Sequence, residues 1–371
     1  MNHHRTPLSP LDYIPAGIAC ARDYEQLAQK FIPADILAYI SGGSGHDITL
    51  RNNEQAFHHW AITPRIMANL DNANTGLELF GNRFRHPLFL APVAYQTLMH
   101  PQGELDTAYA AASTDTCMLA STLSSVTLEQ IAERDHFKHW FQLYFQPRQE
   151  DTEALIKRAI AARYQAIVVT LDAAIQAPSI RAVRAGFKWS DAVIAANLIH
   201  QPPAACAKDS AGLSPIFQSY RRNAPTQQQL QQLIDDSPLP VIIKGVMHPQ
   251  DALQLKASGA AGIIVSNHGG RTLDGAPASL PVLPLVRAAV GDDFPVLFDS
   301  GIRSGSDIFK AIALGADAVL TGRLQLYALS VAGALGVAHM IKLLREELEL
   351  CMAMSGCANL ADIRVTELHK V

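Results

Sequence analysis

One structural unit recurs eight times between residues 87 and 323 of this 371-residue chain. Each unit is a short apolar run, rich in β-branched residues, that ends in polar residues or glycine and is followed by a stretch typical of a helix. The apolar runs are Pro87–Val93, Cys117–Thr122, His139–Phe145, Ala166–Asp172, Pro240–Val246, Gly262–His268, Pro295–Gly301 and Ala318–Arg323. Apolar strands that alternate with helices indicate a parallel sheet covered on both faces, and eight of them predict an α/β fold with a closed TIM (β/α)8 barrel.

An open, doubly wound sheet is the main alternative arrangement of such units. The absence of a G-x-G-x-x-G sequence after the first strand weakens its dinucleotide-binding form. We therefore expect a single domain over residues 1–371. In it, an N-terminal helical extension (1–85) precedes the barrel (86–330), and C-terminal helices (331–371) follow it.

The segments outside the repeated units have their own patterns. Residue types and spacing typical of helices predict helices at Asp23–Ala28, Ala34–Ile40 and Ala332–Met354. We expect the N-terminal ~80 residues, the first two helices and their connectors, to pack outside the barrel. The longest interruption of the repeat lies after the fourth strand, at Gly186–Pro225. A loop of this length inside a compact domain is expected to be a lid or to be disordered.

Composition narrows the classes of partner. Thirty Lys and Arg against 34 Asp and Glu give a net charge of −4, which argues against a nucleic-acid or anionic-membrane partner. No run of apolar residues reaches the ~18 needed for a membrane span. The start, Met1–Gly17, lacks a basic-then-apolar signal pattern, so a cytoplasmic location is expected. The five cysteines are odd in number and form no C-x-x-C pair, so we expect neither a disulfide framework nor a metal site; they are Cys20, Cys117, Cys206, Cys351 and Cys357.

Polar residues gather at the predicted carboxyl ends of the strands, where barrel enzymes carry their active sites. These residues are Ser121, Gln142, Tyr144, Thr170, Asp172, Lys244, His268, Asp299 and Arg323. Because side chains alternate along a strand, Gln142 and Tyr144 share one face, and Ser266 lies on the same face as His268. One such residue alone is more simply explained as a capping group on a strand, but the complete ring predicts a functional site.

The last two strands are followed by loops typical of an anion site. Asp299–Asp307 (DSGIRSGSD) and Thr321–Arg323 (TGR) occupy the usual phosphate position of this fold. Gly301, Gly305 and Gly322 allow close approach of backbone N–H groups, the helix after Ser306 directs its N-terminus inward, and Arg303 and Arg323 supply charge. A glycine-rich turn with solvated arginines explains either loop alone, whereas two adjacent loops favour phosphate. The owner of the phosphate stays open, since many barrels bind phosphosugars here.

The segment Ser266–Gly275 (SNHGGRTLDG) carries the signal for a reaction. His268 closes the sixth strand and is a candidate base, and Arg271 suits a carboxylate through its planar guanidinium. Asp172 on the fourth strand could face His268 and raise its basicity. Lys244 would place a positive charge where negative charge develops on a cofactor ring. A histidine on an apolar strand is usually only packed in the core, but the following Gly-Gly-Arg at a barrel mouth argues against that.

These motifs resemble the FMN-dependent α-hydroxy-acid oxidase and dehydrogenase family, which includes glycolate oxidase, lactate oxidase and mandelate dehydrogenase. The resemblance runs from about Ala38 to Ile363, and SNHGGR (266–271) is its most specific part. It implies FMN over the strand ends, held by Val93, Ala94, Ser121, Gln142, Thr170, Lys244, Ser266, Asp299, Gly301, Arg303, Gly322 and Arg323. It further implies that the catalytic and substrate-binding residues are His268 as base, Asp172 as its partner, Lys244 near flavin N1, and Tyr39, Tyr144 and Arg271 around the hydroxy acid.

The implied reaction is oxidation of an (S)-2-hydroxy acid, or a related derivative, to the 2-oxo product. His268 removes the hydroxyl proton as a hydride passes to the flavin, or removes the α-proton with electrons following; the sequence leaves both open. Oxygen is the expected acceptor, giving hydrogen peroxide. The alternatives are a dehydrogenase that reduces a quinone, cytochrome or protein, a flavin-binding protein without turnover, and a flavin-free phosphate-binding barrel with a Schiff-base lysine at Lys244. The resemblance also implies a homo-oligomer, commonly a tetramer.

One segment departs from the family pattern. After Asp172 the chain reads AAIQAPSIRAVRAGF, which places Ser179 where the family has an arginine that binds the substrate carboxylate. Arg181 and Arg184 lie close enough in the sequence to compensate; otherwise Arg271 and the tyrosines carry the carboxylate alone. Leu123, Tyr95 and Gln176 also differ from the family pattern, so the substrate could be bulkier or could be a neutral ester or amide. The identity of the acid stays open.

Overall fold

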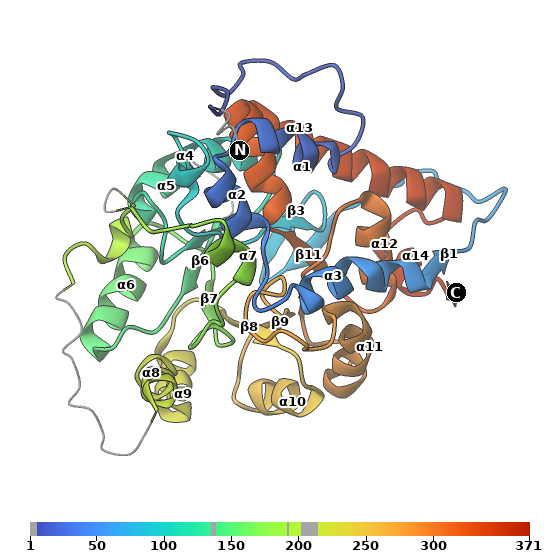
Figure 1. Cartoon of the computed structure of the whole chain (residues 1–371). Coiled ribbons are helices and arrows are strands. Elements are labelled where there is room, and N and C mark those ends of the chain that lie inside the picture. The colour runs from blue at the N-terminus through green and yellow to red at the C-terminus, as the bar shows by residue number, and fades with distance from the viewer. Residues whose placement is uncertain (1–5, 135–138, 191–192, 202–213) are drawn as a thin grey trace.

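Eight parallel strands close into a barrel in the computed structural model, which describes residues 6–134, 139–190, 193–201 and 214–371. Consecutive strands are neighbours around the barrel, and β11 pairs with β4 to close it. The barrel strands are β4 (Leu88–Leu90), β5 (Met118–Ser121), β6 (His139–Leu143), β7 (Ile167–Thr170), β8 (Val241–Val246), β9 (Gly262–Val265), β10 (Val296–Asp299) and β11 (Ala318–Thr321). Each lies within one predicted apolar run, so the predicted TIM barrel is confirmed (Figure 1).

Helices follow the strands and surround the barrel (Figure 1). They are η3 (Gln96–Leu98), α4 (Glu104–Ser113), α5 (Leu128–Arg134), α6 (Gln149–Ala161), α7 (Ile180–Arg184), α8 (Pro215–Asn223), α9 (Gln227–Asp236), α10 (Pro249–Ala257), α11 (Ser279–Val290), α12 (Gly305–Ala313), α13 (Arg323–Ser355) and α14 (Leu360–Arg364). Figure 1 views the end of the barrel over which α2 (Ala34–Ser41) and α7 lie.

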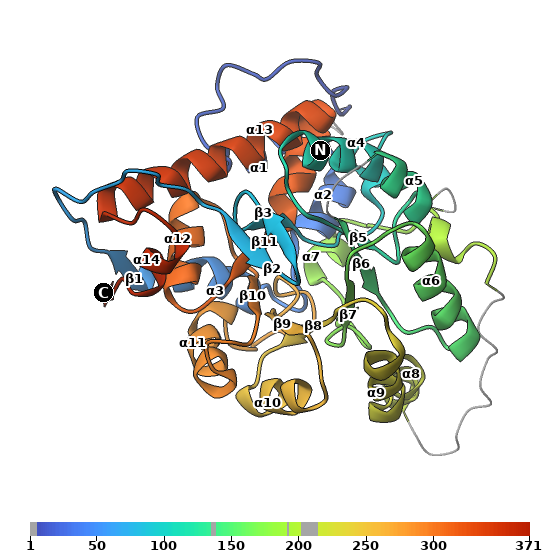
Figure 2. The same ribbon diagram turned by 180° about the vertical axis from the view of Figure 1, so that it is seen from behind.

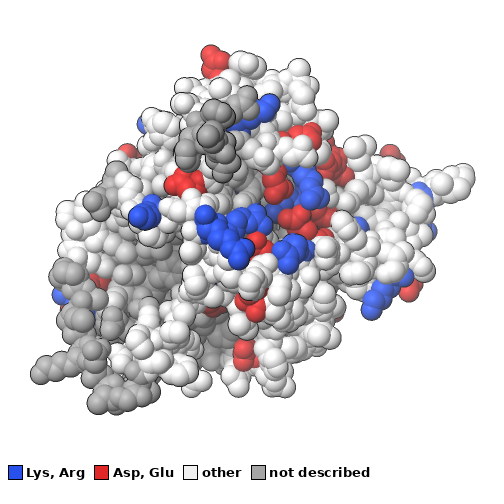
Figure 3. All heavy atoms as spheres, in the orientation of Figure 1, with Lys and Arg blue, Asp and Glu red and all other residues white. Residues whose placement is uncertain are grey.

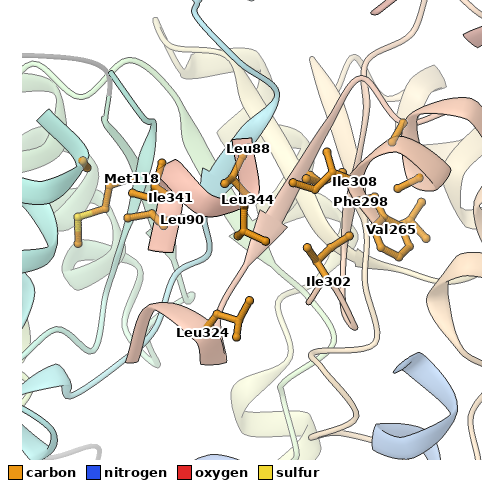
Figure 4. Close-up of a cluster of buried hydrophobic side chains, with 14 of the residues drawn as sticks. Leu88, Leu90, Met118, Val265, Phe298, Ile302, Ile308, Leu324, Ile341 and Leu344 are labelled. Carbon is orange, nitrogen blue, oxygen red and sulfur yellow. The ribbon is translucent and has the colours of Figure 1, made fainter. Parts of the chain in front are cut away.

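Strand alternation divides the core into two parts. The inner part fills the barrel and includes Phe89, Leu119, Trp140, Val168, Ile242, Ile264, Leu297 and Leu320. The outer part packs strand residues such as Leu90 and Phe298 against Ile308 of α12 and Leu344 of α13 (Figure 4). Each fully buried aliphatic or aromatic side chain contributes roughly 1.5–3 kcal/mol. Because both faces of every strand are buried, the strands read as continuous apolar runs.

The N-terminal extension is more varied than the predicted helices and outside connectors. It contains α1 (Asp23–Leu27), η1 (Ala28–Lys30), α2, α3 (Ile48–Gln55), η2 (Ala56–His59), β1 (Trp60–Ile62) and a hairpin of β2 (Leu77–Leu79) and β3 (Asn82–Phe84). The expectation that this segment packs only outside the barrel is wrong. Leu79 and Phe84 of the hairpin join the inner core beside Phe89 and Trp140, and the hairpin covers the end of the barrel opposite α2 and α7 (Figure 2).

The hairpin has a local cause that the sequence hardly signals. Phe80 and Gly81 connect its strands with φ of 50° and 71°. Two positive φ values define the two-residue turn that best matches the twist of paired strands. Glycine adopts this conformation readily, but phenylalanine does so only where packing holds it. Here the Phe80 ring packs edge-on against Trp140.

The C-terminal part also departs from its predicted boundaries. Helix α13 begins at Arg323, directly after β11, and its backbone is non-helical at Ala332 and Gly333. The predicted helix Ala332–Met354 corresponds to the part after this break, and a final strand β12 (Leu368–Lys370) pairs with β1. By length and composition α13 could cross a membrane, but 78% of its most apolar window is buried. It packs against α1, α4 and α12, which explains its apolar character.

The loop predicted at Gly186–Pro225 is partly anchored to the barrel. Its described portion contains η4 (Ala196–Leu198), in which the buried Asn197 accepts a hydrogen bond from Leu128 N (2.8 Å) and donates to the carbonyls of Ser121 and Thr122. Residues 191–192 and 202–213 of this loop lie outside the described residues. Among the cysteines, Cys117 and Cys357 are buried, and Cys206 also lies outside the described residues.

Candidate active site

A cavity of about 390 Å³ opens at the carboxyl ends of the barrel strands. It is lined by most of the residues that the sequence singled out: Tyr39, Val93, Ala94, Ser121, Tyr144, Lys244, His268, Arg271, Asp299, Gly301, Arg303, Gly322 and Arg323. Gln142, Thr170 and Ser266 are buried at the ends of the same strands, and Asp172 contacts His268. The barrel therefore brings together residues that are separated by up to 284 positions (Tyr39 to Arg323).

Alternation along the strands explains why these side chains meet. Trp140, Val168, Ile242, Ile264 and Leu297 point into the barrel. Two residues further along each strand, the same face carries Gln142, Thr170, Lys244, Ser266 and Asp299. The polar layer is thus the direct continuation of the apolar inner core, at the end where the strands reach the cavity.

His268 and Asp172 form a hydrogen-bonded pair. His268 Nδ1 lies 3.0 Å from Asp172 Oδ1, and His268 adopts a left-handed backbone with a φ of 59°. This conformation is uncommon for a residue other than glycine and is often found at functional sites. Burial opposes ionisation of Asp172, but the charge and hydrogen bond of His268 outweigh it and hold the Asp172 pKa below its ordinary value. Asp172 is therefore placed to stabilise an imidazolium at His268.

The position of Asp172 depends on Gly245. Gly245 has a φ of +102° at an irregularity of β8, and a Cβ added there would lie 2.6 Å from Asp172 Cβ and Cγ. Any side chain at residue 245 would therefore push Asp172 away from His268. The sequence VIIKGV contains this glycine, but nothing in its spacing identifies Asp172, which lies just after β7, as its neighbour.

Asp172 should make the stability of the protein dependent on pH. Its folded-state pKa lies below the ordinary value of 3.8, so its contribution is present above that value and is lost as the pH falls through the folded-state pKa. We expect the difference in free energy of unfolding between the wild type and Asp172→Asn to shrink as the pH falls from about 5 to below about 4. Chemical denaturation at a series of pH values measures it, and a difference that stays unchanged down to the acid limb would contradict this assignment.

Lys244 is held in a second buried network. Its Nζ lies 3.0 Å from Asp299 Oδ2 and donates to Ser266 Oγ (2.9 Å), while Ser266 Oγ donates to Asp299 (2.6 Å). Ser266 Oγ also accepts the backbone N–H of His268 (3.0 Å), which connects the lysine to the catalytic turn. Burial opposes the charge of Lys244, but Asp299 and Asp172 outweigh it and raise the Lys244 pKa. Lys244 is therefore a fixed positive charge at the cavity floor.

Two buried groups beside the cavity-lining residues Ser121 and Lys244 fit a hydrogen-bonding ring such as that of FMN. Gln142 Nε2 and Thr170 Oγ1 are buried and form no hydrogen bond within the described part of the chain. Ser121 Oγ donates to Gln142 Oε1 (3.1 Å) and so directs the amide nitrogen. Buried polar groups are nearly always satisfied, so these atoms indicate a polar ligand above β6 and β7.

The sequence predicted a phosphate at the N-terminus of α12, but in the structure the N-terminus of α13 is the one suited to it. The N–H groups around the start of α12 are bound by protein side chains: Asp307 accepts those of Arg303 and Ser304, just before the helix, and Glu347 accepts that of Gly305, its first residue. A Cβ at Gly305 would lie 2.2 Å from Leu348 N, so this glycine is needed for packing against α13. The expectation that Gly305 and the N-terminus of α12 receive the anion is therefore wrong.

The N-terminus of α13 faces the cavity and is suited to an anion. Its N-cap is Gly322, which has no side chain to cap the helix, and Gly322 and Arg323 both line the cavity. Free N–H groups at the start of a helix, with the helix dipole, favour a phosphate. Burial and the nearby charge of Arg271 lower the pKa of Arg323 to about 10, and Arg323 forms no ion pair with any described residue. A bound anion beside Arg323 would offset both the burial of its charge and the repulsion from Arg271.

The two predicted phosphate arginines differ in their surroundings. Arg303 is paired with Glu54 (3.0 Å) and Glu25 (3.4 Å) of the N-terminal extension. Arg323 instead donates to the carbonyls of Ile40, Gly42 and Gly269 and so holds the end of α2 over the cavity. Basic and acidic side chains are accordingly interspersed in the middle of the face shown in Figure 3.

Arg271 and the tyrosines line the cavity close to Arg323, since both arginines donate to the carbonyl of Gly42. Arg271 Nη1 donates to the carbonyls of Tyr39 (2.8 Å) and Gly42 (3.1 Å), and its guanidinium lies 4.8 Å from the centre of the Tyr39 ring. No bond from Arg271 Nε or Nη2 is found within the described residues, so these donors can bind a carboxylate. Burial, reinforced by the charge of Asp172, raises the Tyr144 pKa, so its hydroxyl stays a neutral donor.

No compensating arginine reaches the cavity from the divergent segment. Ser179 caps α7 by accepting from Ala182 N (3.3 Å). Arg181 pairs with Asp47 (2.7 Å), Arg184 is exposed, and neither lines the cavity. Of the two outcomes left open by the sequence, the structure therefore favours the second, in which Arg271 and the tyrosines carry the carboxylate without Arg181 or Arg184.

An aromatic wall at the cavity mouth was not predicted as part of the site. Trp189 packs edge-on against Tyr39 and Tyr95, both at 5.1 Å between ring centres, and Phe187 stacks on Tyr39 at 4.4 Å. Phe187 and Trp189 belong to the loop after β7, so part of the predicted lid does lie at the mouth. The FKW sequence directly after Gly186 was the available signal.

Comparisons with known proteins agree with this geometry. The family model for FMN-dependent dehydrogenases matches residues 28–370. An L-lactate oxidase of Alicycliphilus denitrificans is 54% identical over 96% of this chain and 98% of its own length. A 4-hydroxymandelate oxidase of Amycolatopsis orientalis is 39% identical over 92% of this chain and 96% of its own length. The crystal structure of a mandelate oxidase superposes with a TM-score of 0.86 at 37% identity, covering 95% of this chain and 98% of the other.

The match spans the N-terminal extension, the barrel and the final strand, and the cavity has polar groups suited to each part of FMN. Gln142 and Thr170 lie where a ring would, Lys244 is a fixed cation beside them, and α13 presents its N-terminus to a phosphate. This chain belongs to the FMN-dependent α-hydroxy-acid oxidase family.

Proposed function

We propose that this protein oxidises (S)-lactate, or another (S)-2-hydroxy acid with a small apolar substituent, to the 2-oxo acid and reduces oxygen to hydrogen peroxide. The observation that carries the proposal is the His268–Asp172 pair, which faces the same cavity as Arg271 and the polar groups suited to FMN. The oxidase relatives favour oxygen over a quinone or cytochrome as acceptor.

Each residue has a role that follows from its position. Arg271, with the hydroxyls of Tyr39 and Tyr144, binds the carboxylate of the substrate. His268 accepts the hydroxyl proton at Nε2, because its Nδ1 is bound to Asp172, and Asp172 stabilises the resulting charge. Gln142, Thr170, Lys244 and the N-terminus of α13 would hold FMN, which would supply the two-electron acceptor for oxidation at the α-carbon. Lys244 supplies positive charge where negative charge develops.

The wall opposite these polar groups favours an apolar substituent. Tyr95, Leu123 and Trp189 line the cavity, and no described Lys or Arg other than Lys244, Arg271, Arg303 and Arg323 does so. A second carboxylate or another anionic substituent at this wall would contact apolar side chains without a cationic partner, which is unfavourable. The substrate class is therefore expected to be monocarboxylic 2-hydroxy acids.

The test is an anaerobic titration of the FMN-loaded protein with 2-hydroxy acids and their amides, followed by absorbance. Bleaching of the flavin by (S)-lactate, and peroxide formation when oxygen is admitted, are the expected results. Bleaching without peroxide formation would show that the protein is a dehydrogenase that uses an electron acceptor other than oxygen. Bleaching by the amides alone would show that Arg271 without an arginine at residue 179 does not select for a carboxylate. No bleaching by any compound would contradict hydroxy-acid turnover.

Trp189 should influence which substituents are accepted. Replacing Trp189 by alanine opens the wall at the mouth and removes its contacts with Tyr39 and Tyr95. We expect kcat/KM for (S)-lactate to fall about ten-fold, and the value for an acid with a phenyl substituent to fall less or to rise. Steady-state kinetics with both acids measure this, with Trp189→Phe as the conservative control. An equal loss for both acids would show that Trp189 does not contribute to selectivity.

Two expectations from the sequence stay predictions. The family resemblance implies a homo-oligomer, and the first residues suggest a cytoplasmic location. Light scattering during size-exclusion chromatography of the FMN-loaded protein tests the first, and fractionation of the cells that make the protein tests the second.

A further inference from the structure

Glu104 is a fully buried carboxylate for which the proposed reaction has no use. It is the first residue of α4, has no exposed surface, and forms no ion pair with a described residue. Burial raises its pKa despite the hydrogen bonds that Oε1 accepts, and Oε2 has no hydrogen-bond partner among the described residues. Burying a carboxylate without a cation is costly. The groups that hydrogen-bond to Glu104 therefore indicate what this side chain does.

The carboxylate joins two loops that both reach the cavity. Glu104 Oε1 accepts the backbone N–H of Gln96 (3.1 Å) in the loop after β4, and that of Ser125 (2.9 Å) in the loop after β5. The first loop carries Val93, Ala94 and Tyr95, and the second follows Ser121 and carries Leu123. One oxygen atom therefore holds together the two segments that form one side of the cavity.

Further contacts join the two loops directly to each other and to α4. Tyr95 N donates to the carbonyl of Leu123 (3.1 Å), and Thr97 Oγ1 donates to Ser125 Oγ (2.8 Å). Gln96 is also buried, and its side chain accepts from Thr107 (2.6 Å) of α4. Tyr95 itself has a φ of 53°, a conformation that its own preferences disfavour. The loop after β4 thus takes its shape from these contacts and not from its local sequence.

We propose that Glu104 is a positioning residue that holds the backbone of Val93 and Ala94 against the reactive edge of the flavin. The inference rests on the FMN-dependent oxidation proposed above. It concerns the geometry between the loop and the ring, so it predicts a change in flavin chemistry that exceeds any change in FMN affinity. A purely structural carboxylate would lower stability and leave the bound flavin unchanged.

The test compares Glu104→Ala and Glu104→Gln with the wild type, all loaded with FMN. Glutamine keeps the shape and one acceptor oxygen, whereas alanine leaves the N–H groups of Gln96 and Ser125 without a partner. In Glu104→Ala we expect the rate constant of flavin reduction and the affinity for sulfite, which adds to the flavin ring, each to fall roughly ten- to hundred-fold. The FMN Kd should change less, and Glu104→Gln should recover most of both effects.

Asp362→Ala is the matched control. Like Glu104, Asp362 accepts two backbone N–H groups with its carboxylate. Its donors are Ala358 (2.8 Å) and Asn359 (3.2 Å), just before α14 and away from the cavity. It should lower the melting temperature and leave the sulfite affinity unchanged. Unchanged sulfite affinity and reduction rate in Glu104→Ala would overturn the proposal, as would equal losses in Glu104→Gln and Glu104→Ala. Sulfite binding needs no substrate, so it tests Glu104 even if no hydroxy acid bleaches the wild-type flavin.

Discussion

Replacing His268 by glutamine is expected to slow flavin reduction by about 10²- to 10⁴-fold, the usual contribution of a positioned general base. Glutamine can still donate a hydrogen bond to Asp172, so the geometry of the site should survive. It cannot accept the hydroxyl proton, which His268 is placed to take at Nε2 because Nδ1 lies 3.0 Å from Asp172. Rapid-mixing absorbance under anaerobic conditions, with the hydroxy acid in excess, measures the rate constant.

His86→Gln is the control for loss of a buried imidazole. Burial, with the charge of Arg345, lowers the pKa of His86 to about 3, and the ring bonds to Thr114 and Thr116 outside the cavity. This variant should be less stable but should reduce its flavin at the wild-type rate. A His268→Gln protein that binds FMN and is reduced at the wild-type rate would remove His268 from the mechanism.

Replacing Lys244 by methionine is expected to have the largest effect on stability. It leaves Asp299 as a buried charge without its cation, and breaking a buried ion pair in this way costs about 3–5 kcal/mol. The side chains of Lys244 and Asp299 are only 4% and 11% exposed, so solvent can compensate little. The free energy of unfolding of the FMN-free protein, from urea denaturation, measures this term without the contribution of cofactor binding.

The double variant Lys244→Met/Asp299→Asn separates the charge from the packing. Removing both charges should restore a large part of the lost stability, because no unpaired carboxylate remains. FMN affinity should stay weakened in both proteins, since Lys244 is then absent from the cavity floor. Equal stability of the single and double variants would show that the unpaired Asp299 carboxylate is not the cause of the loss.

The barrel itself could be predicted because its signal is local and repeated. Each strand is buried on both faces, so each reads as a short apolar run, and eight such runs leave few alternative closures. The polar ends of the strands were predicted for the same reason. Gln142 and Lys244 each lie two residues after an inward-facing apolar residue and therefore on the same face of the strand. The long insertion was also recognisable from its composition, although its contribution of Trp189 to the cavity mouth was not.

Contacts between distant segments could not be predicted in this way. The hairpin that fills the end of the barrel depends on Phe80 adopting a positive φ against Trp140. The N-terminus of α12 reads as an anion site, yet Glu347 of α13, 42 residues beyond Gly305, occupies one of its N–H groups. Arg181 reads as a substitute for the missing arginine, yet Asp47 of the N-terminal extension binds it. In each case a residue distant in the sequence contacts or binds the group that the local sequence suggested was free.

The sequence by itself determined the fold, the family and the residues that gather at the strand ends, because these depend on periodicity and on short motifs within single segments. Only the tertiary structure decided which helix N-terminus faces the cavity, which arginine remains available for a carboxylate, and which carboxylate holds the two loops together. These outcomes depend on competition between hydrogen-bonding partners that are distant in sequence, and burial makes each such pairing exclusive because a buried group left unpaired is costly.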